Sequence, residues 1–220
     1  MGDVDLNMDF SKQVIVEAGK LDWVCSPSAG VDRIRLEREN AESGRATTIV
    51  RFVAGSSFPP HSHVRGEEYL VLEGTFSDED GDFGPGWYVR NPPGSCHTPA
   101  SAAGCTIFVK LCQMALEGEP QVNIDTSRQA WRPGTAAGHG IIPLHRGAGE
   151  TVTLERLAPG TGLREGGEEI LVLDGALDFQ GQRLGPRSWI WTPAGVVTTL
   201  ANAEGCVLWI KCGHIRLARL

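Results

Sequence analysis

The chain contains an internal repeat. Residues 66–74 (GEEYLVLEG) recur as residues 167–175 (GEEILVLDG), at an offset of 101 positions. The offset continues without a gap to residue 110, and 17 of the 45 positions from 66 to 110 are identical in the second copy. Average residue usage would give about three identities over this length. A repeat of this size indicates two copies of one folding unit. We therefore predict a first domain over residues 1–117 and a second over residues 118–220.

Each copy has the pattern of an all-β barrel. Short runs rich in β-branched and aromatic residues alternate with clusters of Gly, Pro, Asp and Asn, which is typical of strands and turns. In the first copy the predicted strands are residues 47–53, 67–72, 86–90 and 106–111. The nearest approach to a helical apolar period, residues 31–42, is too polar to predict a helix. The sequence therefore predicts an all-β fold of two tandem antiparallel barrels.

Composition and charge argue against several classes of protein. The chain has 27 acidic and 20 basic residues and a net charge of −7, whereas nucleic-acid binding requires a basic surface. Its apolar runs fall far short of the ~20 residues that a membrane-spanning helix needs. The N-terminus has no signal-peptide pattern, so we expect a cytoplasmic protein. The six cysteines form no Cys-x2-Cys motif, and we expect free thiols.

Three histidines and a glutamate stand out in the first copy. His61 and His63 alternate, so in an extended strand their side chains point to the same face. Glu67 opens the next predicted strand, and we expect it, not Glu68, to point inward. His97 follows a turn thirty residues later. Three imidazoles and a carboxylate suit a divalent zinc, iron, nickel, copper or manganese ion. We predict one such ion in the first barrel.

The other histidines and the cysteines call for simpler interpretations. His139, His145 and His214 lie outside the motif and are predicted to be ordinary core or surface residues. Cys96 precedes His97 and would point the opposite way in a strand, so it is not a predicted ligand. Cysteines 105 and 206 occupy equivalent positions of the two copies and are predicted to pack in strands, although a thiol near the metal could also be oxidised.

The second copy lacks the histidines. At the offset of 101, only Glu67 keeps its counterpart, Glu168; the other three positions become Gly162, Arg164 and Thr198. The segment before the conserved glutamate is also shorter, because Gly160 to Glu168 spans eight steps where Gly55 to Glu67 spans twelve. A carboxylate beside an arginine does not hold a transition metal. We therefore expect the second barrel to be metal-free, with Glu168 paired to Arg164.

The two motifs resemble those of a known superfamily. His61-x-His63-x3-Glu67 and Pro93-Gly94-x2-His97 look like the motifs of the cupins, whose metal lies inside a small double-stranded β-helix, or jelly-roll, barrel. The segments 66–79, 86–95 and 104–110 are similar to the cupin domain of ChrR-type anti-sigma factors. The resemblance covers roughly residues 23–112 closely and roughly residues 131–212 in part. It implies a zinc ion held by His61, His63, Glu67 and His97.

The resemblance leaves three functions open. The first is a zinc-bound regulator that responds to oxidants or singlet oxygen and acts on a regulatory protein partner. ChrR proteins bind a sigma factor through a helical domain with a His-x3-Cys-x2-Cys signature, which this sequence lacks, so direct sigma-factor binding is not expected. The second is a metal-dependent enzyme, such as a dioxygenase acting on a small diketone or enol. The third is a barrel that binds a small-molecule ligand. Because cupin barrels often pair through sheet edges, we also expect the two barrels to pack as an intrachain pseudo-dimer.

Overall fold

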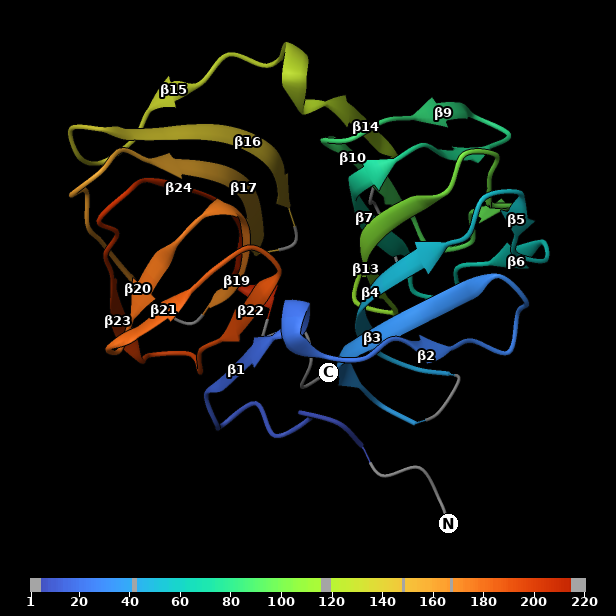
Figure 1. The fold of residues 1–220 in the computed structure, drawn as a ribbon, viewed down its shortest axis with the longest axis horizontal. Helices are drawn as coiled ribbons and strands as arrows, with labels where there is room; N and C mark the ends of the chain where they lie inside the picture. The colour runs from blue at the N-terminus through green and yellow to red at the C-terminus, as the bar shows by residue number, and fades with distance from the viewer. Residues whose placement is uncertain (1–4, 41–42, 116–119, 148, 167, 215–220) are drawn as a thin grey trace. The chain divides into compact units, whose positions relative to one another are not determined.

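The chain is built almost entirely of β-strands (Figure 1). The computed structural model describes residues 5–40, 43–115, 120–147, 149–166 and 168–214; for residues 163–166 and 198 it describes the backbone alone. Among these residues, the helical segments are two short 3-10 turns, η1 (Ala18–Lys20) and η2 (Thr126–Arg128). Within the described ranges, no helix has the length and apolar character that spanning a membrane requires. The predicted all-β fold of two tandem barrels is confirmed.

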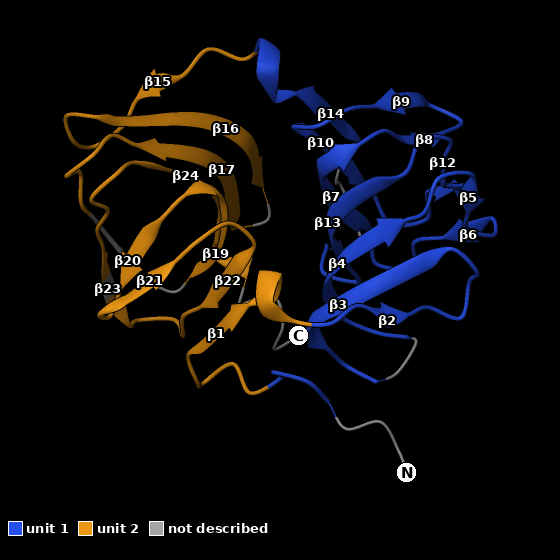
Figure 2. Ribbon diagram, viewed as in Figure 1, with its two compact units in different colours: residues 1–8, 22–128 blue, residues 9–21, 129–220 orange. Residues whose placement is uncertain are grey.

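The strands form two compact units (Figure 2). Unit 1 comprises residues 1–8 and 22–128, and unit 2 comprises residues 9–21 and 129–220. Each unit has a seven-stranded antiparallel sheet as one wall of its barrel and smaller sheets as the other.

The large sheet of unit 1 contains the four strands predicted for the first copy, with their ends displaced by at most two residues. Its order is β14 (Val122–Asp125), β10 (Trp87–Asn91), β7 (Glu67–Gly74), β13 (Cys105–Leu111), β4 (Ala46–Phe52), β3 (Val31–Arg38) and β2 (Val24–Cys25). The opposite wall consists of β5 (Ser56–Ser57), β12 (Ala100–Ser101), β8 (Phe76–Asp78) and β9 (Gly81–Phe83), together with a ribbon of β6 (His61–Ser62) and β11 (Cys96–His97).

The core of unit 1 lies between these walls. Because successive residues of a strand point to opposite faces, Tyr69 and Val71 of β7 face inward while Glu68 and Leu70 face the other side. The inward residues pack against Phe76 of β8, whose ring centroid lies 4.7 Å from that of Tyr69. The metal motifs therefore lie at one end of a packed barrel interior.

The large sheet of unit 2 repeats this arrangement. Its order is β1 (Val14–Glu17), β22 (Ser188–Trp191), β19 (Glu168–Gly175), β24 (Cys206–Cys212), β17 (Glu150–Leu157), β16 (His139–Gly147) and β15 (Arg132–Pro133). Two antiparallel strand pairs accompany it: β18 (Leu163–Gly166) with β23 (Val197–Leu200), and β20 (Leu177–Phe179) with β21 (Gln182–Leu184). Its interior is filled by apolar side chains of several strands, including Ile170, Leu200, Leu208 and Ile210.

The two copies exchange their first strands. β1, at the start of the first copy, pairs with β22 of unit 2, and β14, at the start of the second copy, pairs with β10 of unit 1. Each compact unit therefore contains one segment that lies in the other copy of the repeat: residues 9–21 belong to unit 2, and residues up to 128 belong to unit 1. Each exchanged strand covers a sheet edge that would otherwise present unpaired backbone groups.

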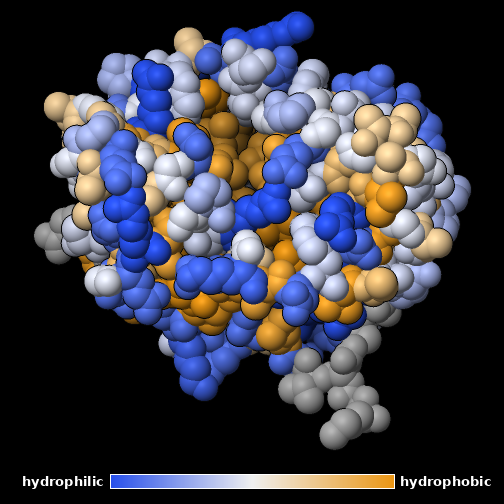
Figure 3. Space-filling view, in the orientation of Figure 1, coloured by the Kyte–Doolittle hydropathy of each residue, from blue (hydrophilic) through white to orange (hydrophobic). Residues whose placement is uncertain are grey.

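The surface has the polar character of an ordinary globular protein. Hydrophilic residues are spread over the face shown in Figure 3, with apolar residues between them. Among the described residues, the most exposed large apolar side chain is Val64, at 75%. Val64 follows the second histidine of the motif, so the loop that carries the predicted ligands reaches the surface.

Candidate metal centre

Two neighbouring elements position the four predicted ligands. In the β6–β11 ribbon, His61 pairs with His97 and Ser62 pairs with Cys96. His63 follows the ribbon, and its backbone N–H donates to the carbonyl oxygen of Ser95 at 2.9 Å. Glu67 is the first residue of β7. The ribbon and the start of β7 thus bring residues thirty positions apart to one place.

A glycine makes the turn between His63 and Glu67. Gly66 has a φ of 73°, in the left-handed region that favours glycine, and a Cβ there would collide with the Sδ atom of Met114. The turn directs Glu67 back toward the histidines. A substitution of Gly66 would therefore disturb the site without touching a ligand.

The four side chains converge. One ligand atom from each of His61, His63, Glu67 and His97 can be chosen so that all lie within 4.8 Å of one another. Oε2 of Glu67 lies 3.5 Å from Nε2 of His63 and 3.4 Å from Nε2 of His97. His63, Glu67 and His97 are buried, and His61 is partly exposed. The structure thus brings together all four residues that the sequence singled out.

Each imidazole is oriented by a second contact at Nδ1. The partners are the carbonyl oxygen of Pro59 for His61 at 3.0 Å, Oγ of Ser95 for His63 at 2.9 Å, and Oδ2 of Asp78 for His97 at 2.9 Å. Carbonyl and carboxylate oxygens only accept hydrogen bonds, so Nδ1 of His61 and of His97 must carry the proton.

The tautomer of His63 follows from its neighbour. Oγ of Ser95 donates its hydrogen to the carbonyl oxygen of Pro92 at 2.6 Å, so it accepts from Nδ1 of His63. Asn91 completes the outer contacts, because its Nδ2 donates to Oε2 of Glu67 at 3.1 Å. All three neutral imidazoles therefore present an Nε2 lone pair, the form that binds a metal.

The donor set fits a metal ion. Nε2 of His63 and Nε2 of His97 are buried and have no hydrogen-bond partner among the described residues. Burying an unsatisfied polar atom is unfavourable, so two such atoms beside a carboxylate indicate that a ligand belongs there. Imidazole nitrogens and a carboxylate oxygen suit a divalent transition metal. The cluster of four side chains is therefore a candidate metal centre.

The two buried histidines have opposite pKa shifts. Burial lowers the pKa of His63 below its ordinary value, and this outweighs the attraction of the Glu67 carboxylate. Burial also acts to lower the pKa of His97, but the hydrogen bond to Asp78 and the charges of Glu67 and Asp78 outweigh it, so that pKa is raised. Of these two histidines, His97 thus holds a proton more readily in the metal-free protein.

A cavity of about 430 Å³ adjoins the cluster. His61, His63 and Glu67 line it, together with apolar side chains of the barrel interior such as Val50 and Ile107. A small molecule in the cavity could therefore approach a metal held by the cluster.

Neighbouring candidates lie outside the cluster. Cys96 is exposed whereas His97 is buried, consistent with opposite orientations in β11. Glu68 faces away from Glu67, and its carboxylate accepts hydrogen bonds from Tyr88 at 3.1 Å and Arg90 at 2.8 Å.

In the second copy, the strand pairing does not follow the offset of 101 residues. β18 and β23 pair Glu165 with Thr198, so the residue opposite the counterpart of His97 is Glu165 and not Gly162. The shortened loop accounts for this, because the deletion falls between the ribbon and the conserved glutamate. Glu168 is buried. The expected pairing of Glu168 with Arg164 involves a side chain outside the described residues. Among those described, the first copy holds the one group of this kind.

The remaining histidines are paired with carboxylates. His139 Nε2 lies 2.8 Å from Oε2 of Glu155, and His214 Nε2 lies 3.1 Å from Oε2 of Glu169. His145 Nε2 is 3.7 Å from Oε1 of Glu150. The sequence does not show these pairs, because each joins residues of different segments without a fixed spacing.

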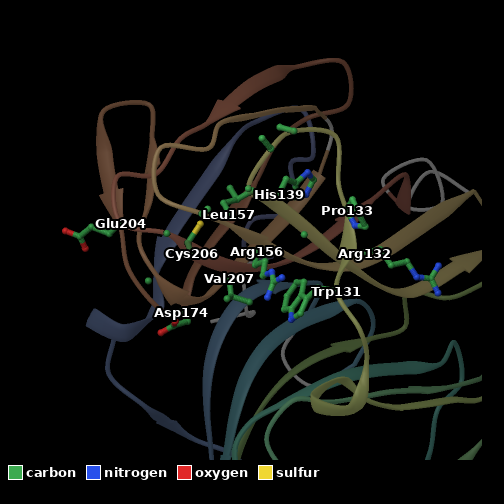
Figure 4. A pocket seen from close by; sticks show the side chains of 17 residues that line it. Trp131, Arg132, Pro133, His139, Arg156, Leu157, Asp174, Glu204, Cys206 and Val207 are labelled. Carbon is green, nitrogen blue, oxygen red and sulfur yellow. The ribbon is translucent and has the colours of Figure 1, made fainter.

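Unit 2 contains a larger cavity, of about 860 Å³ (Figure 4). The Arg156 guanidinium lies 4.8 Å from the centroid of the Trp131 ring, and both residues line this cavity with His139. Nε2 of His139 faces Glu155, and Nδ1 accepts a hydrogen bond from the backbone N–H of Thr135 at 3.1 Å. Because both ring nitrogens are engaged, we place the candidate chemistry in unit 1.

Comparison with solved structures shows the same fold. A protein described as a putative dioxygenase from Nostoc punctiforme matches with a TM-score of 0.76 at 14% identity, over 91% of this chain and 82% of that one. The protein Ylba from E. coli matches with a TM-score of 0.68 at 17% identity, over 92% and 91% of the two chains. A salicylate 1,2-dioxygenase from Pseudaminobacter salicylatoxidans matches with a TM-score of 0.67 at 13% identity, over 97% and 87%. These identities establish the fold alone.

The sequence family is more informative. The search of curated proteins found no match. The family model for the ChrR cupin-like domain matches residues 11–115 and again residues 119–216, and so covers both copies of the repeat. Two matches over nearly the whole chain, together with the barrels and the histidine cluster, show that the chain belongs to the ChrR cupin-like domain family.

Proposed function

We propose that the protein is a zinc-bound regulator that responds to oxidants. The observation that carries the proposal is the convergence of three neutral imidazoles and Glu67 in unit 1. For zinc bonds of about 2.0–2.1 Å, the edge of a tetrahedron is about 3.3 Å. The separations of 3.5 and 3.4 Å from Glu67 to His63 and His97 are close to this value. Four protein ligands would complete such a site, as in zinc centres without a catalytic role.

The β6–β11 ribbon supports an oxidant response. It has two residues in each strand and carries His61 and His97, so its local stability is low. Cys96 lies in the ribbon with an exposed thiol, beside His97 and opposite Ser62. Peroxide would convert this thiol to a sulfenic acid, with water as the other product. The added oxygen would disturb the pairing that holds two of the four ligands.

A regulatory protein partner and a cytoplasmic location belong to the same proposal. All six cysteines have free thiols, which is typical of proteins in the reducing cytoplasm. Oxidative or singlet-oxygen stress would then be the signal, and zinc release would change what the partner recognises.

The experiment measures zinc release from the intact chain. Zinc-loaded protein is exposed to hydrogen peroxide, or to photosensitised singlet oxygen, and the freed ion is followed with a coloured chelator. We expect release from the wild type and slower release from Cys96→Ser. Cys25→Ser is the matched control, because Cys25 is the other exposed cysteine and lies on the edge strand β2. Retention of zinc by the oxidised wild type, or equal slowing by both variants, would reject the oxidant-sensing role.

A metal-dependent enzyme is the second candidate, and the cavity favours it. Its volume of about 430 Å³ leaves room for a small substrate beside three of the four ligand residues. A bound iron, nickel or manganese ion would supply Lewis-acid or redox chemistry there. His61, His63, Glu67 and His97 would hold the ion, and Val50 and Ile107 would exclude water from the substrate.

Metal content and turnover separate the two candidates. Iron in protein purified from its native host, with sustained oxygen consumption in the presence of a small diketone or enol, would support the enzyme. Zinc content without turnover would support the regulator. His63→Ala is the control, because loss of that ligand must abolish metal-dependent turnover while leaving any contaminating activity.

A further inference from the structure

An arginine stacked on a tryptophan occurs at the same place in both units. In unit 1 the guanidinium of Arg51 on β4 lies 4.4 Å from the centroid of the Trp23 ring. In unit 2 the guanidinium of Arg156 on β17 lies 4.8 Å from the centroid of the Trp131 ring. Each tryptophan directly precedes the edge strand of its large sheet, β2 or β15. The strand registers therefore make the two pairs counterparts of each other.

The two pairs differ in the residue that faces the arginine from the next strand. Asp32 of β3 lies directly opposite Arg51, and its Oδ2 is 2.6 Å from Nη2 of that arginine. Gly140 of β16 lies directly opposite Arg156. On its other side, Arg156 faces Val207 of β24. The second unit thus keeps the arginine and its tryptophan but lacks the carboxylate.

Arg156 lines the cavity of about 860 Å³ in unit 2, as do Trp131, Gly140 and Val207. Figure 4 shows its side chain between Trp131 and Val207. Within the described part of the chain, Arg156 forms no ion pair, and its side chain is exposed. Stacking covers one face of a guanidinium and leaves the N–H groups at its edge free to donate. The cavity therefore contains a cation whose counterpart in unit 1 holds a carboxylate.

Two carboxylates also line this cavity, and neither takes the place of Asp32. Glu204 is paired with Arg183, whose Nη2 lies 2.5 Å from its Oε2. Asp174 of β19 pairs with Val207, which pairs with Arg156 on the following strand. Two strand spacings, about 10 Å, therefore separate the backbones of Asp174 and Arg156. An anion on Arg156 does not have to displace a carboxylate of the chain.

We propose that the cavity of unit 2 binds the carboxylate of a small organic acid on Arg156, in the place that Asp32 takes on Arg51. A guanidinium can donate two parallel hydrogen bonds to a carboxylate. The cavity volume is that of a small-molecule site, and Trp131 and Val207 give its wall apolar surface for the body of the acid. The site needs no metal, so it goes beyond the functions proposed for unit 1 and does not depend on them.

Benzoate is the probe, and benzyl alcohol is its neutral counterpart of similar size. Each is titrated into the full chain and followed by ligand-observed NMR. The arginine is exposed, and exposed ion pairs contribute modestly, so we expect benzoate to bind about fivefold more tightly than benzyl alcohol. Equal affinities, or no benzoate binding up to about 10 mM, would overturn the proposal.

The variant Gly140→Asp transfers the carboxylate of unit 1 to unit 2. A Cβ at residue 140 would lie 2.8 Å from Nε of Arg156, which belongs to a flexible side chain that can shift. Because the new carboxylate would occupy the guanidinium, we expect benzoate affinity to fall to that of benzyl alcohol. Gly140→Asn adds the same shape without the charge, and it should keep the preference for benzoate. An equal effect of the two variants would contradict the assignment.

Arg156→Met removes the proposed donor itself. We expect benzoate binding to weaken about fivefold, with no change for benzyl alcohol. Arg51→Met is the matched control, because it makes the same substitution at the counterpart whose guanidinium is already paired with Asp32. It should leave both affinities unchanged. An unchanged benzoate affinity in Arg156→Met, or an equal loss in Arg51→Met, would overturn the proposal.

Discussion

Oδ2 of Asp78 lies 2.9 Å from Nδ1 of His97, and the two residues come from different sheets. Asp78 ends β8 of the four-stranded sheet, whereas His97 belongs to the β6–β11 ribbon. The contact ties the ribbon to the barrel wall and turns Nε2 of His97 toward Glu67. Such outer partners fix the tautomer and the ring orientation of a metal-binding histidine.

Removal of this contact should weaken metal binding. We expect Asp78→Ala to reduce zinc affinity by about 10- to 100-fold, the usual effect of losing an outer partner. Asp82→Ala is the control, because Asp82 is exposed and its Oδ1 accepts from Ser77 Oγ within the same small sheet. A competition titration with a chromogenic chelator measures both variants. Equal affinities of wild type and Asp78→Ala would show that the contact does not tune the metal.

The metal content should be one equivalent per chain. We expect elemental analysis to give about one zinc in the wild type and little in His61→Ala or His63→Ala, because three ligands remain in each variant and affinity depends on the full set. Glu168→Gln changes the counterpart of Glu67 in the second copy and should leave the content unchanged. Two equivalents in the wild type would contradict the expectation that the second barrel is metal-free.

Zinc affinity should fall as the pH falls. Metal binding requires neutral imidazoles, so protons compete for the ligands. The pKa of His97 is raised above its ordinary value, and competition therefore begins above pH 6.5 and strengthens as the pH drops through that pKa. The lowered pKa of His63 adds to the loss only at lower pH. We expect about a tenfold loss per pH unit for each displaced proton. Dissociation constants measured between pH 8 and pH 5 test this, and a constant affinity across the range would contradict it.

Chelation should loosen unit 1 selectively. A ligand that binds the folded state at a thousand times its dissociation constant stabilises that state by about 4 kcal/mol. Zinc removal should therefore increase hydrogen–deuterium exchange in peptides that cover β6, β11 and the start of β7. Peptides from β19 and β24 serve as the internal reference. Exchange that is the same with and without chelator would mean that the ion does not stabilise the barrel.

The fold was accessible from sequence because its signals are local and repeated. The strand β7 was predicted from its β-rich run and from the match between Glu67–Gly74 and Glu168–Gly175, and the structure has the same bounds for that match. The weak helical period over residues 31–42, from which no helix was predicted, includes the strand β3 (Val31–Arg38). Its polar residues include Arg33, which faces the cavity and breaks the usual alternation of polar and apolar positions.

The four candidate ligands could be chosen from sequence because His61 and His63 alternate in the sequence and the motif supplied Glu67 and His97. Their outer partners could not, because Asp78 meets His97 through tertiary packing. The offset of 101 residues also does not hold for positions before Gly66, because the second copy has a shorter loop before its conserved glutamate. A gap-free alignment therefore cannot show that Glu165 lies opposite Thr198. The sequence also could not predict the exchange of β1 and β14, because pairing between strands far apart in the chain leaves no periodic pattern in the sequence.

The exchanged strands impose an order on biosynthesis. β1 leaves the ribosome early but must wait for β22, near the other end of the chain, before its hydrogen bonds can form. Unit 1 needs only β14 to complete its sheet, and β14 follows soon after β13. Unit 1 can therefore complete its large sheet while the rest of unit 2 is still being translated. A fragment that contains only one copy of the repeat therefore lacks one strand of its compact unit, because that strand lies in the sequence of the other copy.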